Sequence, residues 1–411
     1  MSPLRDRRFA LLAAGQAVNG IGSWCALIAM WGYAAYRFDA GPAQIALITL
    51  SWSIPPTLIG PFAGVPIDRL GPRRVLVAAD LGAAAVSFAL MGVGSFNVLL
   101  AFGLLHGITR AFSEPAFAAL PPRLVADRDL LAANAVLGLA LHVSIAVGPL
   151  VAAGAIAAWG MRGAFAIDAL TYLVGVAVVL PLKIVSGVRS REQSVMGDLR
   201  DGLKTVRDRP ALVRLLALAT SVYIVWGAYA VIEPLYVRDV LHRSPATLAL
   251  LQSVFGVTLV ANGFLAARAG ERIARIETVI FAAAASGLAA LLYVGTATLA
   301  VAIVGIAIWG AATAWFVPPN RTLVQRAAPV ETHGRVLAFD ATLRSGANVV
   351  AASLTGVAAV LIGVQAAALV VASIPVAAAA KIALGRRALV SVDETAPVAT
   401  RAVAPTLPGV E

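Results

Sequence analysis

Residues 64–74 read Gly-Val-Pro-Ile-Asp-Arg-Leu-Gly-Pro-Arg-Arg and form a polar segment between two apolar runs. Residues 263–272 read Gly-Phe-Leu-Ala-Ala-Arg-Ala-Gly-Glu-Arg and repeat the glycines and arginines of that segment at the same spacing. Gly107 precedes Pro115 by the same interval by which Gly310 precedes Pro318. Two sets of matching positions indicate that the chain consists of two similar halves.

Apolar runs make up most of the chain on either side of these segments. Of its 411 residues, 60% are hydrophobic and 13% are charged, which is typical of a chain that lies mostly in a bilayer. Each run is long enough to cross a hydrocarbon core of about 30 Å as a helix. We therefore predict an all-α polytopic membrane protein with 12 transmembrane helices in two six-helix bundles. The predicted helices cover residues 9–33, 43–65, 75–93, 96–119, 131–157, 163–183, 211–236, 245–267, 276–294, 297–318, 335–361 and 365–385.

Basic residues are concentrated in the loops of one side. The loops after the second, fourth, eighth and tenth runs are rich in arginine, and the opposite loops have few. Because positively charged loops stay in the cytoplasm, we expect a multi-pass protein of the bacterial cytoplasmic membrane with both termini cytoplasmic. The predicted parts are an N-terminal bundle at 1–184, a cytoplasmic linker at 185–210, a C-terminal bundle at 211–386 and a disordered cytoplasmic tail at 387–411. The later part of the linker has apolar residues at helical spacing, which predicts a surface helix.

The sequence argues against several functional classes. The net charge of +11 comes from residues scattered over many loops, so we expect no nucleic acid partner. The chain has no Gly-x-x-x-x-Gly-Lys-Ser/Thr motif, so ATP is not expected to energise it directly. The single cysteine, Cys25, has no metal-ligand pattern around it, and the four histidines are scattered along the chain. We therefore expect neither an enzyme nor a bound metal or other cofactor.

Two ionisable pairs lie inside predicted helices, where each charge needs a partner or an aqueous cavity. Arg110 precedes Glu114 by four residues, and Asp340 precedes Arg344 by the same interval. Residues at this spacing share one face of a helix. Either the two pairs face each other's half across a central pathway, or each pair is a structural lock between helices. In the first case, we expect Glu114 and Asp340 to contribute to proton coupling or gating.

Further candidates are acidic, aromatic and polar residues of the predicted helices. Asp80, Asp168 and Glu233 lie near helix ends, which argues against a central ligand role, and Asp168 is expected either to cap a helix or to pair near the surface, for example with Arg162. Aromatic residues at helical spacing either line a pocket for a bulky ligand or contact lipid, and amide side chains are expected to face the interior. These residues are Tyr223, Trp226, Tyr229, Trp309 and Trp315, and Gln16, Asn19, Gln252, Asn262 and Asn348.

The segment from Gly64 to Arg74 resembles the loop 2–3 signature of the major facilitator superfamily, Gly-x-x-x-Asp-Arg-x-Gly-Arg-Arg, with Pro72 in place of a basic residue. The resemblance implies the major facilitator fold, and a gating motif whose aspartate latches the outward-facing state against the eleventh helix. We expect Gly64 to allow close helix packing, Asp68 to cap a neighbouring helix and Gly71 to permit a tight turn. Alternatively, the arginines only set topology. The motif residues are Gly64, Asp68, Arg69, Gly71, Arg73 and Arg74.

Within the superfamily, the chain resembles the branch of macrolide and siderophore exporters. Gly148 and Pro149 in the fifth predicted helix look like a degraded antiporter signature, although generic close packing explains them equally well. The residues that carry the resemblance to this branch are Gln16, Asn19, Gly22, Trp24, Asp80 and the segment 167–170.

The resemblance and the residues together predict a secondary active exporter of a hydrophobic or amphipathic small molecule, such as a drug, an antibiotic or a siderophore. We expect alternating access with proton-coupled antiport, so that the proton gradient is the energy source. The expected partners are the small-molecule substrate and membrane lipid, and the expected oligomeric state is a monomer. Two alternatives remain. One is a transporter of lysophospholipid or another lipid with the same fold, and the other is a non-transporting membrane scaffold or sensor.

Overall fold

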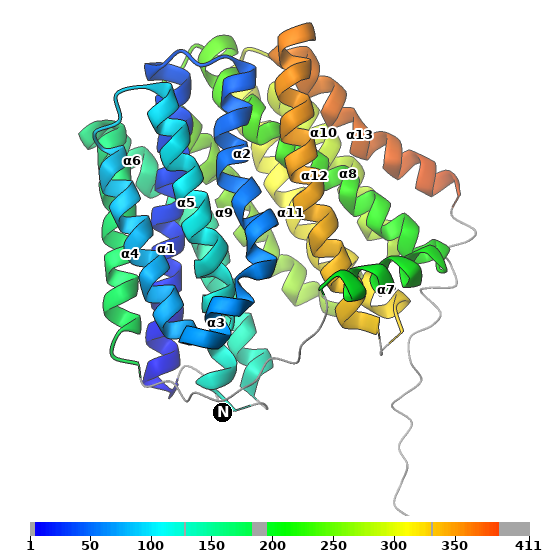
Figure 1. Ribbon diagram of the computed structural model, residues 1–411. Helices are drawn as coiled ribbons and strands as arrows, with labels where there is room; N and C mark the ends of the chain where they lie inside the picture. Colours follow the sequence, from blue (N-terminus) through cyan, green and yellow to red (C-terminus); the bar gives the residue numbers. More distant parts are fainter. Residues whose placement is uncertain (1–4, 127–128, 183–194, 330–331, 386–411) are drawn as a thin grey trace, which may run out of the picture.

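The computed structural model describes residues 5–126, 129–182, 195–329 and 332–385, and all regular secondary structure in these ranges is helical (Figure 1). The predicted disordered tail and the first part of the predicted linker lie outside the described residues. The N-terminal half contains α1 (Arg7–Gly32), η2 (Tyr33–Arg37), α2 (Pro42–Ile59), η3 (Gly60–Phe62), α3 (Gly64–Leu70), α4 (Pro72–Leu90), α5 (Phe96–Ala118), η4 (Pro121–Arg123) and α6 (Leu130–Val179).

The second half of the chain begins after a short amphipathic helix. That helix, α7 (Val195–Arg207), packs on α8 and α12 at the end of the molecule where α3 also lies (Figure 1). The elements that follow are α8 (Pro210–Leu235), η6 (Tyr236–Val240), α9 (Pro245–Ala269), η7 (Gly270–Ile273), α10 (Ile276–Val294), α11 (Leu299–Ala327), α12 (His333–Ile362) and α13 (Val364–Leu384).

Twelve helical segments have membrane-spanning length. Ten of the described helices are long and apolar enough to cross a membrane, and one of these, α6, is two helices that meet at Gly160, where φ is +68° and ψ is −173°. The helix α4 adds another span, because its 19 residues extend about 28 Å, although Arg73, Arg74 and Asp80 make it less apolar. The expected fold class is therefore confirmed. The sequence predicted a loop between helices ending at 157 and beginning at 163. In the structure this loop is replaced by a change of direction at Gly160 within α6.

The helices pack as two groups that meet in the middle of the molecule. In the N-terminal half, α1 packs on α6 and α5 packs on α2 and α4; in the C-terminal half, α11 packs on α9 and α10. Gly107 of α5 lies against the Ser51 backbone of α2, and Gly310 of α11 lies equivalently against the Phe255 backbone of α9. A side chain at either glycine would collide with the neighbouring helix, so the repeated glycines have the same packing role.

Among the described residues, two helix pairs make most of the contacts that join the halves. The helix α9 packs on α6, where Gly256 lies against the backbone of Ile145, and α12 packs on α2, where Gly356 lies against Ala46. In both places the absence of a side chain lets the two helices approach closely. The contacts across the middle of the molecule therefore depend on small residues.

The loop 2–3 motif folds differently from the prediction in two respects. Residues Gly64–Leu70 form the short helix α3, and Gly71 follows with φ +84°, so the expected turn at Gly71 is confirmed. A Cβ atom added at Gly64, however, would meet open space, so Gly64 does not mediate close packing. The helix α4 has no side-chain cap, so Asp68 does not cap it. Asp68 and Arg69 are exposed.

Hydrogen bonds link the two halves at the end of the molecule opposite α3, which we name the η2–η6 face after its two π-helical turns. The Arg238 guanidinium donates to the carbonyl oxygens of Ala35 at 2.6 Å and Ala40 at 3.1 Å, and it lies 3.1 Å from an Asp39 carboxylate oxygen. The Tyr36 hydroxyl donates to the Arg243 carbonyl at 2.8 Å. These contacts close the η2–η6 face between the halves.

Candidate functional site

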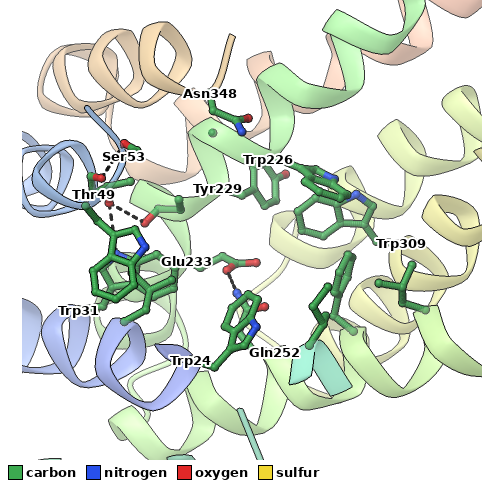
Figure 2. A pocket seen from close by; sticks show the side chains of 17 residues that line it. Trp24, Trp31, Thr49, Ser53, Trp226, Tyr229, Glu233, Gln252, Trp309 and Asn348 are labelled. Carbon is green, nitrogen blue, oxygen red and sulfur yellow. Dashed lines mark hydrogen bonds between the residues drawn. The ribbon is translucent and has the colours of Figure 1, made fainter. Parts of the chain in front are cut away.

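An aromatic cavity of about 280 Å³ lies between the two halves (Figure 2). The N-terminal half contributes residues of α1, α2 and α6, and the C-terminal half contributes residues of α8, α9, α11 and α12. We call it the central cavity. Its lining residues are Trp24, Leu27, Trp31, Thr49, Trp52, Ser53, Ile145, Trp226, Gly227, Tyr229, Ala230, Glu233, Gln252, Phe255, Leu259, Trp309 and Asn348.

Aromatic rings form a connected wall on the C-terminal side of the central cavity. The ring centroid of Trp309 lies 5.0 Å from that of Tyr229 and 5.2 Å from that of Phe255, and Phe255 contacts Trp226 edge to face at 6.4 Å. Edge-to-face pairs are a favourable arrangement of aromatic rings. Trp226, Tyr229 and Glu233 are three and four residues apart on α8, which places them on the same face of that helix. The prediction that aromatic residues of this region line a pocket is realised for Trp226, Tyr229 and Trp309.

Of the described residues that line the central cavity, one carries a carboxylate. Glu233 is 2% exposed, and the Gln252 amide of α9 donates a hydrogen bond to it. Figure 2 shows this pair in the middle of the lining, with Trp31 on one side and Trp309 on the other. The sequence argued against a central position for Glu233 because it lies near the end of a predicted helix. That expectation is wrong, because η6 continues α8 beyond Glu233 and leaves this residue at the depth of the cavity.

A second, more polar cavity of about 370 Å³ adjoins the central one toward the α3 end of the N-terminal half. Four residues, Trp24, Leu27, Trp52 and Ile145, line both cavities. The structure brings further sequence candidates together here, since Gln16, Asn19, Arg110 and Glu114 also line this cavity.

Arg110 and Glu114 form the ion pair expected from their spacing. The Arg110 guanidinium donates to the Glu114 carboxylate at 2.5 Å, and it also lies 4.7 Å above the ring of Trp52, a distance typical of a cation–π contact. The Glu114 side chain is 56% exposed. The pair therefore faces the second cavity and is connected through Trp52 to the central one.

Asp340 and Arg344 behave differently from the first pair. Although they are one turn apart on α12, the described residues contain no ion pair between them, and neither lines either of the two cavities. Arg344 instead lies 5.9 Å above the ring of Tyr223, and Asp340 Oδ1 is buried without a hydrogen-bond partner among the described residues. The two ionisable pairs thus do not form one symmetrical arrangement in this structure. Tyr223 contacts Trp226 edge to face but does not itself line the central cavity.

Asp168 lies in the interior of the N-terminal half and not near the surface. It accepts hydrogen bonds from the Ser87 hydroxyl at 2.5 Å and pairs with His106 Nε2 at 3.2 Å, and all three side chains are fully buried. The expected pairing with Arg162 is therefore wrong, because the Asp168 carboxylate faces Ser87 of α4 and His106 of α5. The Gly148–Pro149 motif, which lies in α6, packs closely as expected, because Gly148 lies directly against Trp24.

Several lining residues were not identified from the sequence. Trp31, Trp52 and Phe255 lie in the central cavity, but as isolated aromatic residues in apolar helices they carry no signal that separates a cavity wall from a lipid-facing surface. Gln252 and Asn348 were expected only to face the interior, and the structure places both on the cavity. For these two residues, the free-energy cost of leaving an amide side chain in lipid was the sequence signal that predicted an interior position.

Comparison with known proteins identifies a family whose model covers nearly the whole chain. The family described as transmembrane secretion effector matches residues 1–407. The chain is 26% identical over 286 residues to macrolide efflux protein A of Streptococcus pyogenes, which covers 67% of this chain and 70% of the relative. It is 23% identical over 370 residues to an uncharacterised MFS-type transporter of Bacillus subtilis, covering 87% of this chain and 88% of the relative.

Solved transporter structures share the fold. A bacterial homologue of the human lysosomal transporter Spinster, in an inward-facing and unoccupied conformation, aligns with a TM-score of 0.70 at 14% identity, covering 96% of this chain and 98% of that one. A POT family transporter in complex with 5-aminolevulinic acid aligns with a TM-score of 0.73 at 10% identity, covering 94% and 97%. The chain is therefore a multi-pass membrane transporter and not an enzyme, and it belongs to the transmembrane secretion effector family of the major facilitator superfamily.

Proposed function

We propose that this transporter exports a hydrophobic or amphipathic small molecule by alternating access, with the proton gradient as energy source. The observation that carries the proposal is the central cavity, which is aromatic, lies between two similar halves and is closed on one side by contacts across the η2–η6 face. A cavity at the interface of two six-helix halves is the place where a transporter of this architecture binds its cargo.

The orientation follows from the arginines of the loops. We infer that the α3 face, where Asp68, Arg69 and Arg74 are exposed, lies in the cytoplasm together with both termini of a bacterial cytoplasmic membrane protein. The closed η2–η6 face is then external, so the structure represents a state that receives cargo from the cytoplasm or the inner leaflet. Exposure of Asp68 agrees with this state, because the resemblance assigns its latch contact to the opposite one.

The chemistry of the cavity and the name of one relative both support the proposed kind of cargo. Tryptophan, tyrosine and phenylalanine rings offer large apolar contact areas, and Glu233, Gln252 and Asn348 add a few polar groups that orient a ligand. A relative with 26% identity is named macrolide efflux protein A, and macrolides are large amphipathic molecules. We therefore propose macrolide-like antibiotics as the first substrates to test.

Proton coupling is assigned to acidic residues outside the aromatic wall. Glu114 lines the polar cavity and is exposed enough to exchange a proton with water, and Asp340 has an unpartnered carboxylate oxygen. We propose that Glu114 and Asp340 contribute to coupling. Full export driven by a pH gradient in vesicles that carry Glu114→Gln or Asp340→Asn would remove this assignment.

The decisive experiment is an accumulation assay in an efflux-deficient bacterial host. Expression of the chain should lower the steady-state accumulation of erythromycin, and a protonophore should restore accumulation to the level of the empty host. Inverted vesicles loaded with labelled lysophospholipid test the lipid alternative in parallel. If accumulation of a panel of amphipathic drugs does not change and labelled lipid moves between leaflets, the drug-export proposal is wrong.

A further inference from the structure

The central cavity has a net negative formal charge when its carboxylate is ionised. Glu233 is the one acidic residue in the lining, and no lysine or arginine is among the described residues that line this cavity. Of the described residues, Gln252 is the one that hydrogen-bonds to Glu233, and it is uncharged. A buried carboxylate without a cationic partner is costly, and a ligand with a positive charge removes that cost.

The walls around this carboxylate are suited to the same kind of ligand. Five tryptophans line the cavity, namely Trp24, Trp31, Trp52, Trp226 and Trp309. The face of an indole ring attracts cations, and sites built of aromatic rings recognise quaternary and protonated amines. The protein itself demonstrates this property, because the Arg110 guanidinium lies 4.7 Å above the ring of Trp52 from the neighbouring polar cavity.

Three polar atoms of lining residues lack partners. Trp226 Nε1, Trp309 Nε1 and Asn348 Oδ1 are buried and make no hydrogen bond within the described part of the chain. Buried polar atoms without partners are rare in folded proteins, and a bound ligand is one way to satisfy them. The two indole N–H groups are donors, so a ligand with acceptor oxygens can satisfy them.

We propose that the central cavity binds a lipophilic organic cation, such as a protonated or quaternary amine that also carries hydrogen-bond acceptors. Glu233 provides the opposite charge, Gln252 holds the carboxylate in place, and the indole rings of both halves contact the apolar body of the ligand. This inference rests on the proposed function, because it names the substrate class of the same cavity. Glu233 would discriminate a cation from an uncharged molecule of similar shape, while the aromatic wall would bind both.

A binding assay on the purified full-length protein in detergent tests this assignment. The probes are radiolabelled tetraphenylphosphonium, which is a permanent cation, and triphenylphosphine oxide, which has similar rings, an acceptor oxygen and no net charge. Glu233→Gln should raise the Kd for the cation at least tenfold and change the Kd for the oxide by less than twofold. Glu233→Asp, which keeps the charge, should recover most of the affinity for the cation.

The matched control is Glu271→Gln, because the Glu271 side chain is 81% exposed and pairs with Arg326 away from the cavity. It makes the same chemical change and should leave both Kd values unaltered. Absence of cation binding to the wild-type protein, or an unchanged Kd for the cation in Glu233→Gln, would overturn the proposal. Thermal unfolding of each variant establishes that the protein is folded when binding is measured.

Transport of the same probes separates this inference from the proposed function. If the cation binds with the expected dependence on Glu233 and neither the cation nor erythromycin is exported from loaded cells, export fails as the function while the cation site stands. If Glu233→Gln exports a macrolide and the cation at wild-type rates, the cation site is wrong while export stands.

Discussion

His106 Nε2 lies 3.2 Å from Asp168 Oδ2, and both side chains are fully buried between α4, α5 and α6. The same carboxylate oxygen accepts a hydrogen bond from Ser87 at 2.5 Å, and the ring of Trp52 stacks on that of His106 at 4.4 Å. Because Trp52 lines both cavities, this polar cluster is separated from the ligand space by one indole ring. The cluster therefore holds three helices of the N-terminal half together directly behind the site.

Removal of the Asp168 carboxylate should destabilise the protein. Asp168→Ala leaves the Ser87 hydroxyl and the His106 ring without their acceptor, and each buried polar group left unsatisfied costs about 1–3 kcal/mol. We expect a clear fall in the Tm of the detergent-solubilised protein. Asp168→Asn should cost less, because the amide oxygen still accepts a hydrogen bond. The control Asp208→Ala changes an exposed residue and should alter stability by less than about 0.5 kcal/mol; a Tm for Asp168→Ala equal to that of this control would contradict the assignment.

Loss of the Arg238 side chain should open the η2–η6 face. Arg238→Ala removes two hydrogen bonds to carbonyl oxygens of the other half, and a loss of about 1–2 kcal/mol shifts a two-state equilibrium by roughly 5- to 30-fold. Spin labels at Ala43→Cys and Ser244→Cys, in a Cys25→Ala background, should report a larger population of long distances. Arg243→Ala is the control, because only its backbone carbonyl takes part in the contact with Tyr36. Identical distance distributions for the two arginine variants would show that Arg238 does not hold this face closed.

A methyl group at Gly256 should disturb the contact between the halves. The added Cβ would collide with the Ile145 carbonyl oxygen, so α6 and α9 must separate, and overpacking of this kind costs about 1–3 kcal/mol. We expect a lower Tm for Gly256→Ala and a change in the spin-label distances. Gly263→Ala on the same helix meets open space and should be neutral or slightly stabilising, since alanine favours helix more than glycine does. Equal effects of the two substitutions would mean that the close approach of α6 and α9 is unimportant.

Neutralisation of Asp68 should impair transport without impairing binding. Asp68 is exposed in this structure, and it lies outside both cavities, so Asp68→Asn should leave the affinity for tetraphenylphosphonium unchanged. If the aspartate stabilises the opposite state, as the resemblance implies, export of erythromycin should fall several-fold. Asp208→Asn is a matched exposed acid and should retain normal export. Normal export by Asp68→Asn would rule out the latch, and a cellular phenotype that persists without any transport would favour the scaffold alternative.

The sequence by itself determined the number of spans and their order. A helix is the element that satisfies its own backbone groups in lipid, so long apolar runs predict spans regardless of what surrounds them. The sequence also predicted the break near Gly160, the turn at Gly71 and the equivalence of Gly107 and Gly310. These features could be predicted because backbone freedom and close helix packing each require glycine at particular positions. The ion pair of Arg110 and Glu114 was expected from their spacing and is present.

Only the tertiary structure decided which side chains meet. The sequence predicted Glu233 and Asp168 to be peripheral, yet one lies in the central cavity and the other in a buried cluster, and the similar spacing of Asp340 and Arg344 did not produce an ion pair. The reason is that hydropathy places the ends of a span only to within a few residues and does not fix the rotation or tilt of its helix. Those are set by contacts between helices that are distant in sequence, such as α6 with α9 and α2 with α12. The aromatic cavity forms only because these contacts bring together two halves that are far apart in the sequence.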